Sequence, residues 1–581
     1  MFIKFHKKSK NRRLISLFIV FFVFLLHGFG LYSSSGRDDV HITYWASKVF
    51  AETGELTNLN GAQVEQSSSL LHTLILSLIY IISGVPLPSI GAIFSILMGA
   101  LTLLLAWKYA GFIKIEKRWY VPALLALSPY FVYWSFGGLE SSLVAFIVLI
   151  TLHSVTLFLL KPLSTKNFIY VFVTVFCYLS VRPESVFVIL LFFILTVFFV
   201  FLQKTKNFSQ LDINKKLFQL ITVSLLVFVI ISIWRYLNFE QIFPQPVYAK
   251  ASGVHIQKIK EGLKYIIRSK LLSLIILFMF SINTIYKVIL NKSKDVNIKF
   301  IVLLSFVIAY SSFVVVSGGD WMEGGRFLVP LIPLIILMAT PSIIRLKKTG
   351  VLIITMLILI STSETIWFAK QKSTGIPYFE VSKVLDKLDK SKLSIPYKKY
   401  SWFEYTNRVH LRDIPLISEL NRIIPLLLKE RKETVSILSN QMGMVPYYIA
   451  GKYFKNVEFV DMRALVTKHF TECEVTSGLP KGMSGLELNY EFFFNSVDDI
   501  SLKCGIPRPM IIYDLPQPED RLNLMAKNGY EVIYVQQGRV TSPFGGFIVG
   551  AGQYIAIRND LVSIIEKNKL LIHTWPTWSV N

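Results

Sequence analysis

The chain has 581 residues, of which 53% are hydrophobic and 17% charged, and its net charge is +24. With a mean hydropathy of +0.52, this is not the composition of a soluble globular protein, because the charged residues lie between apolar runs long enough to cross a bilayer. The lysines and arginines flank these runs, as the positive-inside rule describes, so the positive charge does not indicate a nucleic-acid partner.

The first apolar run, Leu14 to Tyr32, follows the basic stretch KFHKKSKNRR. A signal peptide would begin in the same way, with a positive segment before an apolar one. Here the apolar core is long, no small-residue cleavage site follows it, and many further apolar runs do. We therefore expect a retained first membrane span.

Apolar runs of about 20 residues, the length needed to cross a hydrocarbon core of about 30 Å, recur up to the end of the membrane part. We expect eleven spans, near residues 14–34, 88–108, 119–135, 141–160, 167–181, 185–203, 217–237, 271–290, 299–317, 327–344 and 350–368. The run at 70–84 is shorter, and we interpret it as an interfacial helix. Counting it as a span would place the lysine-rich loops outside, against the positive-inside rule.

This topology puts the N-terminus in the cytoplasm and the C-terminal part on the extracytoplasmic side of what we take to be a bacterial inner membrane. The loops assigned to the cytoplasm carry KIEKR, KPLSTK, NKSK and RLKK, whereas short outer loops such as RPE hold almost no lysine. The outer loop at 238–270, which has five lysines, is the exception.

From about residue 369 the sequence no longer has membrane character. Short apolar runs typical of strands, such as ETVSILS, NVEFVD, RPMIIYDL, EVIYVQQG and QYIAIR, occur with the helical patterns MVPYYIAG and DRLNLMAKNGY. This pattern predicts a soluble α/β domain at 369–581, with a mainly parallel sheet, after a transmembrane domain at 1–368. Cys473 and Cys504 lie in this part, and the sequence leaves open whether they form a disulfide.

Unusual polar residues gather in the predicted outer loops, beginning with an acidic pair in the first extracytoplasmic loop, 35–87. They are Asp38, Asp39, Glu140, Arg182, Glu184, Arg235, Tyr248, Lys250, Asp320 and Arg326. Ionisable groups at the ends of spans are costly unless they pair or have a function. Each also has a simpler explanation, such as a helix cap, a glycine-rich turn or a solvated lysine. Their convergence on one face is what indicates a site.

A site of this kind suits transfer from a phospholipid-linked donor. One carboxylate can act as general base toward an acceptor hydroxyl, and a second can orient it or hold a divalent cation such as Mg²⁺, Mn²⁺ or Ca²⁺. Arginine and lysine can bind a phosphate and stabilise it as it leaves. The sequence has no GxxxxGK[ST] loop and no GxGxxG motif after a strand, so no nucleotide cofactor is expected.

These motifs, in this order, resemble those of the GT-C superfamily of membrane glycosyltransferases, and more narrowly the arabinofuranosyltransferases that add terminal β-1,2-linked arabinofuranose to envelope arabinan. The similar segments are DDVHITYWASKVFAETGEL, VEQSSSLLHTLIL, GGLESSL, VRPE, FPQPVYAK, GGDWMEGGRFLVPLIPL, NQMGMVPYYIAG and VEFVDMRALVTKHF. The sequence departs from that family at VEQSSSLL, where relatives commonly have a Gly-Tyr-Thr-Ser type segment, and at MRAL, where a Gly-Leu pair is usual. These departures bear on the sugar and the acceptor more than on the reaction class.

The resemblance implies an inverting transfer from a polyprenyl-phosphate sugar to a cell-envelope glycan or lipid-linked acceptor. One residue of the pair Asp38 and Asp39 would be the general base. The other aspartate, together with Glu140, would hold a metal or the substrate, and the tentative metal ligands are therefore Asp39 and Glu140. The residues expected at the donor phosphate are Arg182, Lys250 and Arg326. The residues expected to bind substrate are Glu140, Glu184, Tyr248 and Asp320.

Two other functions remain possible for such a chain: a flippase or transporter of lipid-linked glycans, and a ligase or polymerase of O-antigen type. A transporter would carry charges near the centres of its spans, and the charges here lie at the outer ends. The ligase would need a large outer loop with several arginines and a histidine, whereas the loop at 238–270 has His255 but only Arg268. The C-terminal domain is expected to pack ordinarily or to bind the acceptor glycan through its aromatic residues, which include Trp402, Phe403, Tyr447, Tyr448, Trp575 and Trp578.

Overall fold

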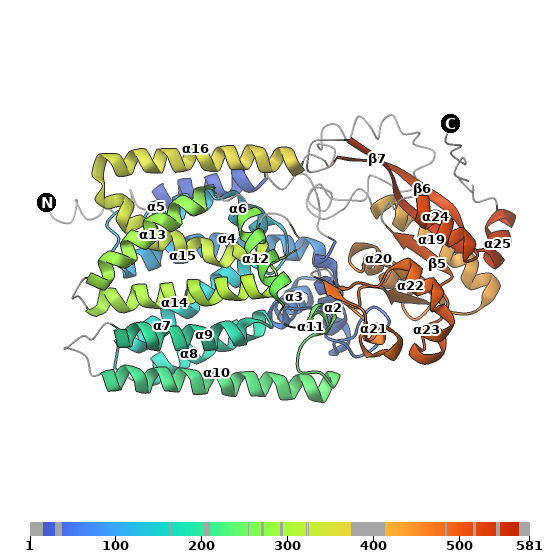
Figure 1. Ribbon diagram of the computed structural model, residues 1–581, viewed down its shortest axis with the longest axis horizontal. Coiled ribbons are helices and arrows are strands. Elements are labelled where there is room, and N and C mark those ends of the chain that lie inside the picture. Colours follow the sequence, from blue (N-terminus) through green and yellow to red (C-terminus); the bar gives the residue numbers. More distant parts are fainter. Residues whose placement is uncertain are drawn as a thin grey trace.

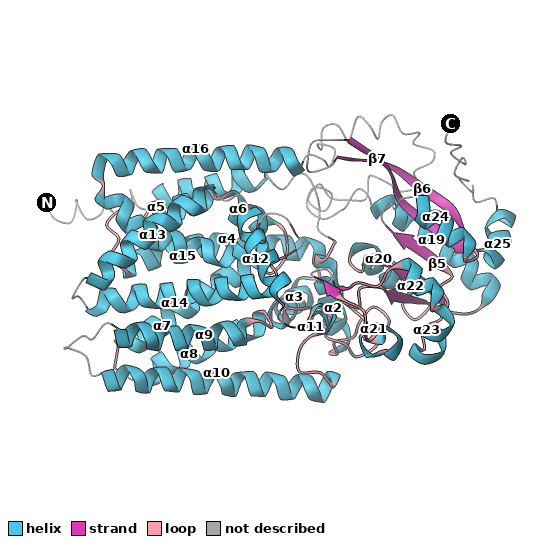
Figure 2. Ribbon diagram, viewed as in Figure 1, coloured by secondary structure: helices cyan, strands magenta, loops and turns pink. Residues whose placement is uncertain are grey.

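The computed structural model shows a helical bundle joined end to end with a mixed α/β domain (Figure 1). It describes residues 15–29, 38–162, 164–202, 210–251, 253, 255–268, 272–290, 294–320, 322, 325–372, 413–482, 485–514, 519–541 and 547–568. Among these described residues, all strands lie in the C-terminal domain, as the colouring in Figure 2 shows.

The bundle is built from helices of very different length. In chain order these are Ile15–Phe29, α2 (Val40–Thr53), α3 (Leu70–Ser83), α4 (Leu87–Phe112), α5 (Tyr120–Leu127), α6 (Pro129–Phe136), α7 (Ser141–Leu160), α8 (Thr165–Val181), α9 (Ser185–Leu202), α10 (Gln210–Phe239), α11 (Gln245–Lys250), α12 (Ile256–Arg268), α13 (Leu272–Leu290), α14 (Lys294–Ser317), η1 (Arg326–Leu331), α15 (Ile332–Arg345) and α16 (Lys347–Lys372).

Within the described ranges, seven helices are long and apolar enough to cross a membrane: α4, α7, α9, α10, α14, η1 with α15, and α16. The other four predicted spans also coincide with helices, but these are shorter or bent. The first and the fifth appear as Ile15–Phe29 and α8, and the eighth as α13, which lies at 99° to α12. The number of eleven crossings therefore stays a prediction.

The predicted span at 119–135 is wrong as one continuous helix. It is divided into α5 and α6 at Ser128, whose ψ of 112° is extended rather than helical. The cause is Pro129, because a proline ring disfavours the helical conformation in the residue before it and supplies no N–H. Helix α3, at 14 residues, has the short length predicted for the run at 70–84.

The C-terminal domain has helices on both faces of a five-stranded sheet. Its elements are α19 (Asp413–Arg431), β1 (Val435–Ser439), α20 (Met444–Tyr453), β2 (Val457–Asp461), α21 (His469–Glu472), η3 (Glu474–Thr476), β3 (Lys481–Gly482), β4 (Gly485–Leu486), α22 (Tyr490–Asn495), α23 (Val497–Cys504), β5 (Ile511–Asp514), α24 (Glu519–Lys527), β6 (Tyr530–Thr541), β7 (Phe547–Arg558), η4 (Asn559–Leu561) and α25 (Val562–Lys567).

The strand order is β2-β1-β5-β7-β6. Strands β2, β1 and β5 are parallel, as predicted, but β7 is antiparallel to both β5 and β6. The prediction of a mainly parallel sheet was therefore wrong for its second half. Only five residues separate β6 from β7, and a connection this short favours antiparallel pairing, because a parallel crossover needs a dozen or more residues.

Alternate residues of the central strands face opposite cores, as the pleat requires. In β1, Ile437 packs with α19 and with Val445 of α20, whereas Leu438 packs on the other face with α22 and α23. Cys473 and Cys504, left open by the sequence, form a disulfide that joins the start of η3 to the end of α23.

The first loop of the bundle and the C-terminal domain interlock. Trp45 and Val49 of α2 belong to the same buried cluster as α19 and β1. The side-chain amide of Asn60 donates to the carbonyl of Phe459 at 2.9 Å and accepts from the N–H of the same residue at 2.8 Å. Figure 1 shows α2, α3 and α11 at the end of the bundle that faces this domain. The loops at this end carry the candidate site.

Candidate functional site

Arg182 is the centre of a buried ion-pair triad. It follows α8, where the chain turns through Pro183 into α9, and Glu140 precedes α7. The guanidinium group binds the carboxylate of Glu140 through Nη1 and the carboxylate of Glu184 through Nε, the latter at 2.8 Å. All three side chains are at least 88% buried. The motifs GGLE and RPE therefore form one structure.

The electrostatics of this triad follow from burial and pairing. Burial alone would raise the pKa of Glu140, but the guanidinium groups of Arg182 and Arg326 outweigh it and hold that pKa at about 2. Both carboxylates oppose the desolvation of Arg182 and raise its pKa above the ordinary value. Glu140 and Arg182 are therefore both ionised at neutral pH.

A second ion pair lies in the connection between α14 and η1. Nε of Arg326 is 2.6 Å from Oδ2 of Asp320, and both side chains are at least 90% buried. Gly319 has a φ of +81°, and any Cβ there would clash with the ring of Tyr265 in α12. The hydroxyl of Tyr265 accepts a hydrogen bond from the N–H of Phe327 at 3.2 Å. Glycine is thus required for α12 to hold this connection in place.

The triad around Arg182 and the pair of Arg326 with Asp320 lie against the same aromatic ring. The Arg182 and Arg326 guanidinium groups lie 5.2 and 5.3 Å from the centre of the Phe327 ring, close enough for a cation–π interaction. Both belong to a charged group that also includes Lys250 at the end of α11. Here we name Arg182, Lys250, Arg326, Glu140, Glu184 and Asp320 the charged cluster.

The pKa of Lys250 shows how closely these residues gather. Burial lowers this pKa below its ordinary value, and Arg326 and Arg182 lower it further. The carboxylates of Asp320 and Asp39 act in the opposite direction. Four groups from three different segments thus lie within electrostatic range of one ammonium group.

The acidic pair lies where α2 begins, against the C-terminal domain. Asp39 is the N-cap residue of α2, but its side chain makes no capping hydrogen bond to that helix. The carboxylate of Asp38 accepts a hydrogen bond from the backbone N–H of Met444, the first residue of α20, at 2.5 Å. Side-chain capping of α2 therefore does not account for this pair.

Tyr248 has a local role. Its hydroxyl accepts hydrogen bonds from the N–H groups of Ile242 and Phe243, at 3.1 and 3.4 Å, and so closes the turn that leads into α11. Tyr248 stands two residues before Lys250 in the chain, but these hydrogen bonds do not reach a residue of the charged cluster. Its expected role in substrate binding stays a prediction.

Sequence reasoning missed Glu65, which lies within VEQSSSLL. It forms a bidentate ion pair with Arg235 at 2.6 and 2.9 Å, and both residues are 4% exposed. Its carbonyl accepts the N–H of Gln245, whose side chain donates in turn to the carbonyls of Ala464 and Thr467. These contacts join the first loop, α10, α11 and the C-terminal domain. A glutamate before a serine run gives no signal of this in the sequence.

Among the described residues, no group of three or more His, Cys, Asp or Glu side chains is arranged to hold a metal ion. Of the two tentative metal ligands, Glu140 is bound to Arg182. Of the aromatic residues suggested for sugar stacking, Tyr447 and Tyr448 lie in α20, whereas Trp402, Phe403, Trp575 and Trp578 fall outside the described residues.

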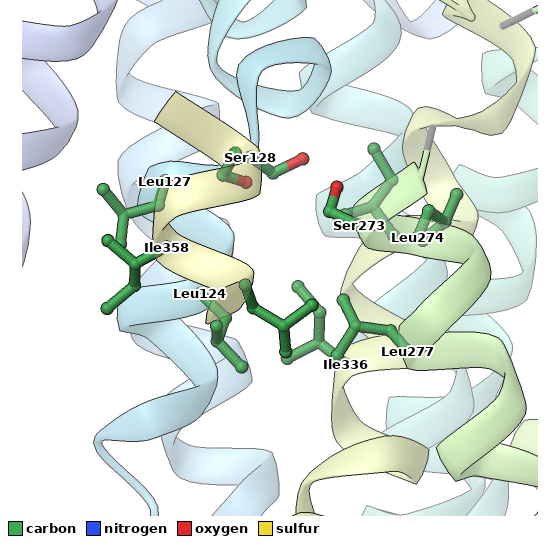
Figure 3. Close-up of a pocket in the computed structure, with 11 residues that line it drawn as sticks. Leu124, Leu127, Ser128, Ser273, Leu274, Leu277, Ile336 and Ile358 are labelled. Atoms are coloured by element: carbon green, nitrogen blue, oxygen red, sulfur yellow. The ribbon is translucent and has the colours of Figure 1, made fainter. Parts of the chain in front are cut away.

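A separate small hollow lies between α5, α13, α15 and α16 (Figure 3). Leucine and isoleucine side chains line most of it, with the hydroxyls of Ser128, Ser273 and Ser361. Ser273, one of the lining residues, donates hydrogen bonds from its N–H and its hydroxyl to the carboxylate of Glu364. No lining residue belongs to the charged cluster, so this hollow is not part of the candidate site.

No protein-family model and no curated protein matches this sequence, but solved structures do. ArnT from Cupriavidus metallidurans, bound to undecaprenyl phosphate, is similar over 94% of this chain and 98% of its own, with a TM-score of 0.50 and 10% identity. The oligosaccharyltransferase AglB from Archaeoglobus fulgidus, in complex with an inhibitory peptide and a dolichol-phosphate, is similar over 93% and 74%, with a TM-score of 0.54 and 11% identity.

Another structure of an Archaeoglobus fulgidus oligosaccharyltransferase, in complex with Zn and sulfate, is similar over 92% of this chain and 73% of its own, with a TM-score of 0.52 and 13% identity. At such identities the likeness concerns the fold. Both proteins are polytopic membrane proteins with a C-terminal domain, and both belong to the GT-C superfamily. This chain therefore shares the overall fold of these ArnT and oligosaccharyltransferase structures.

Proposed function

We propose that this chain is an integral-membrane glycosyltransferase that moves a sugar from a polyprenyl-phosphate donor to a cell-envelope glycan or lipid-linked acceptor on the extracytoplasmic side. The observation that carries the proposal is the gathering of Arg182, Arg326 and Asp39 of the acidic pair within electrostatic range of Lys250. Support comes from the fold, because similar structures hold undecaprenyl phosphate and a dolichol-phosphate.

The reaction is a single displacement that inverts the anomeric centre. A carboxylate accepts the proton of the acceptor hydroxyl, and the acceptor oxygen forms a bond to the anomeric carbon. The bond from that carbon to the phosphate oxygen breaks, and its electron pair leaves with the polyprenyl phosphate. The phosphate charge grows by one as it leaves, and Lys250 and Arg326 stabilise the added charge.

Asp38 is the better candidate for the base. The acceptor must attack from the side opposite the leaving phosphate, and Asp39 is the member of the pair whose charge acts on Lys250. Asp38 instead lies against α20, where an N–H donor at a helix N-terminus favours the ionised carboxylate that a base requires. Asp39 then orients Lys250 on the phosphate side.

Arg182 has a different role from Lys250. Its guanidinium group is already bound by two carboxylates, so it fixes the shape of the charged cluster and contributes less net charge to a phosphate. Glu140 and Glu184 act through Arg182, and Asp320 holds Arg326. A divalent cation does not fit this donor set, since Glu140 is committed to Arg182 and no three-ligand group occurs among the described residues.

The sugar to test first is arabinofuranose, which the family resemblance implies. The full-length protein in lipid nanodiscs is given a polyprenyl-phosphate arabinofuranose donor and an arabinan oligosaccharide, and product is followed by mass spectrometry. We expect Asp38→Asn to lower kcat by about 10²- to 10⁴-fold, as loss of a general base does, with the fold retained. The exposed Asp499→Asn in α23 is the matched control.

Two results would contradict the proposal. Full activity in both Asp38→Asn and Asp39→Asn would show that neither carboxylate is the base. Movement of a lipid-linked glycan across the bilayer, without release of polyprenyl phosphate, would identify a flippase instead.

A further inference from the structure

The carboxyl edge of the parallel strands faces the acidic pair. Strand β1 ends at Ser439, and after four intervening residues the chain enters α20 at Met444, which packs against α2. At the carboxyl ends of parallel strands, the connections that follow commonly build functional sites. Here the connection from β1 to α20 contacts Asp38, because the N–H of Met444 donates a hydrogen bond to its carboxylate at 2.5 Å.

Gly443 allows this approach. A Cβ at this position would clash with both the backbone oxygen and the carboxylate of Asp38. Any residue other than glycine would therefore separate the start of α20 from the start of α2. This explains the glycine in the NQMGMVPYYIAG motif, which sequence reasoning recognised without a reason for it.

The alignment of the two helices is fixed by further contacts. The ring of His41 lies 5.3 Å from that of Tyr447, and its Nδ1 is 3.2 Å from the backbone oxygen of Asp38. Trp45, one turn further along α2, also contacts Tyr447, with the ring centres 6.5 Å apart. The N-terminus of α20 therefore has one set position relative to Asp38.

We propose that the C-terminal domain completes the catalytic centre, with Gly443 and Met444 as positioning residues for the carboxylate of Asp38. The N–H of Met444 binds Oδ1 and so fixes the rotation of the carboxylate. A hydrogen bond to a charged acceptor, at the positive end of a helix, also favours the ionised form of that carboxylate. The inference rests on Asp38 as the base in the proposed function.

This role differs from acceptor binding. If the domain only bound the acceptor glycan, its changes would raise KM for the acceptor, and a minimal acceptor would react normally. If the domain positions the base, kcat falls even with a short acceptor, while the affinity for the donor is kept. The split between kcat and KM distinguishes the two roles.

The test uses the full-length protein in nanodiscs with a disaccharide acceptor. Gly443→Ala is compared with Gly451→Ala, which lies in the same helix and faces only Lys48 Nζ, at 3.8 Å. We expect Gly443→Ala to lower kcat by about 10- to 100-fold, the range for losing a hydrogen bond to a charged group, with an unchanged KM for the donor. Gly451→Ala should behave as the natural protein.

A second variant covers the case in which Gly443→Ala does not fold. The α-hydroxy analogue of methionine, incorporated at position 444, replaces the N–H by an ester oxygen and keeps the side chain. We expect the same loss of kcat. Natural kcat in this variant, while Asp38→Asn is inactive, would overturn the positioning role alone. Full activity of Asp38→Asn would remove the base assignment, and the positioning role with it.

Discussion

Replacing Arg182 by methionine should destabilise the protein strongly at neutral pH. The change leaves the carboxylates of Glu140 and Glu184 buried without their shared partner. Removing one member of a buried ion pair typically costs about 3–5 kcal/mol. The pKa of Glu140 gives a similar value, because its lowering from 4.5 to about 2 corresponds to about 3 kcal/mol at about 1.4 kcal/mol per unit.

The sign of the pH dependence follows from the direction of this shift. The folded-state pKa of Glu140 lies below the ordinary value, so the stabilisation is complete above the ordinary pKa and is lost as pH falls toward the folded-state pKa. Without Arg182, the burial of Glu140 favours its protonated form. The difference in stability between the natural protein and Arg182→Met should therefore narrow as pH falls from neutral toward about 4.

Thermal unfolding in nanodiscs, followed by intrinsic fluorescence across this pH range, measures the effect. Lys264→Met is the control, since Lys264 is 51% exposed and its pair with Glu261 is a surface pair worth at most about 1 kcal/mol. Arg182→Met combined with Glu140→Gln should regain part of the stability, because one orphaned charge is gone. An unfolding temperature equal to the natural one at neutral pH, or a difference independent of pH, would refute the reasoning.

Three further predictions concern the surroundings of the site. Glu65→Ala should destabilise the protein by about 3–5 kcal/mol, whereas Glu65→Met with Arg235→Met should be nearly neutral, as unfolding temperatures would show. Gly319→Val, at a φ of +81° and against a tyrosine ring of α12, should weaken binding of polyprenyl phosphate at least about tenfold in a titration. Replacing both Cys473 and Cys504 by serine should lower the stability of the C-terminal domain by about 3–4 kcal/mol, because the disulfide closes a loop with a sequence separation of 31. A reductant should cause the same loss of stability in the natural protein.

The sequence predicted elements well wherever one local pattern decides them. Apolar runs became helices, and the strand-like segments ETVSILS and NVEFVD became the parallel pair β1 and β2. Two predictions failed for reasons of geometry beyond composition. Apolar content hides the break at Pro129, although the proline itself was visible. The pairing of β7 with β5 depends on the place that β7 takes in the sheet, which alternation along the chain does not encode.

The candidate site was predictable in part because charge is conspicuous next to a membrane. Residues such as Arg182 and Asp320 stand out at the ends of apolar runs, and the structure brings both into the charged cluster. Glu65 was hidden because its partner is 170 positions away in the sequence. The contact made by Met444 could not be predicted, because its donor is a backbone N–H, which every residue except proline has. Specific contacts between distant segments, and contacts made by backbone groups, could not be predicted from the sequence.

Within the charged cluster, Lys250 is the cation whose protonation a donor phosphate can shift. Arg182 is bound by two carboxylates and Arg326 by one, whereas Lys250 lies partly buried with its pKa lowered by burial and by both arginines. A phosphate beside Lys250 would offset that repulsion and favour the ammonium form. Donor binding should therefore be coupled to the protonation of Lys250.

This coupling sets the sign of a further pH effect. A sugar-phosphate diester keeps one negative charge at neutral and alkaline pH, so only the protein titrates there. As pH rises through the lowered pKa of free Lys250, each binding event must take up a proton, and the affinity for the donor should fall by up to about tenfold per pH unit. Lys250→Arg keeps its charge throughout and should bind with little pH dependence. Equal alkaline loss of affinity in Lys250→Arg and the natural protein would show that another group titrates.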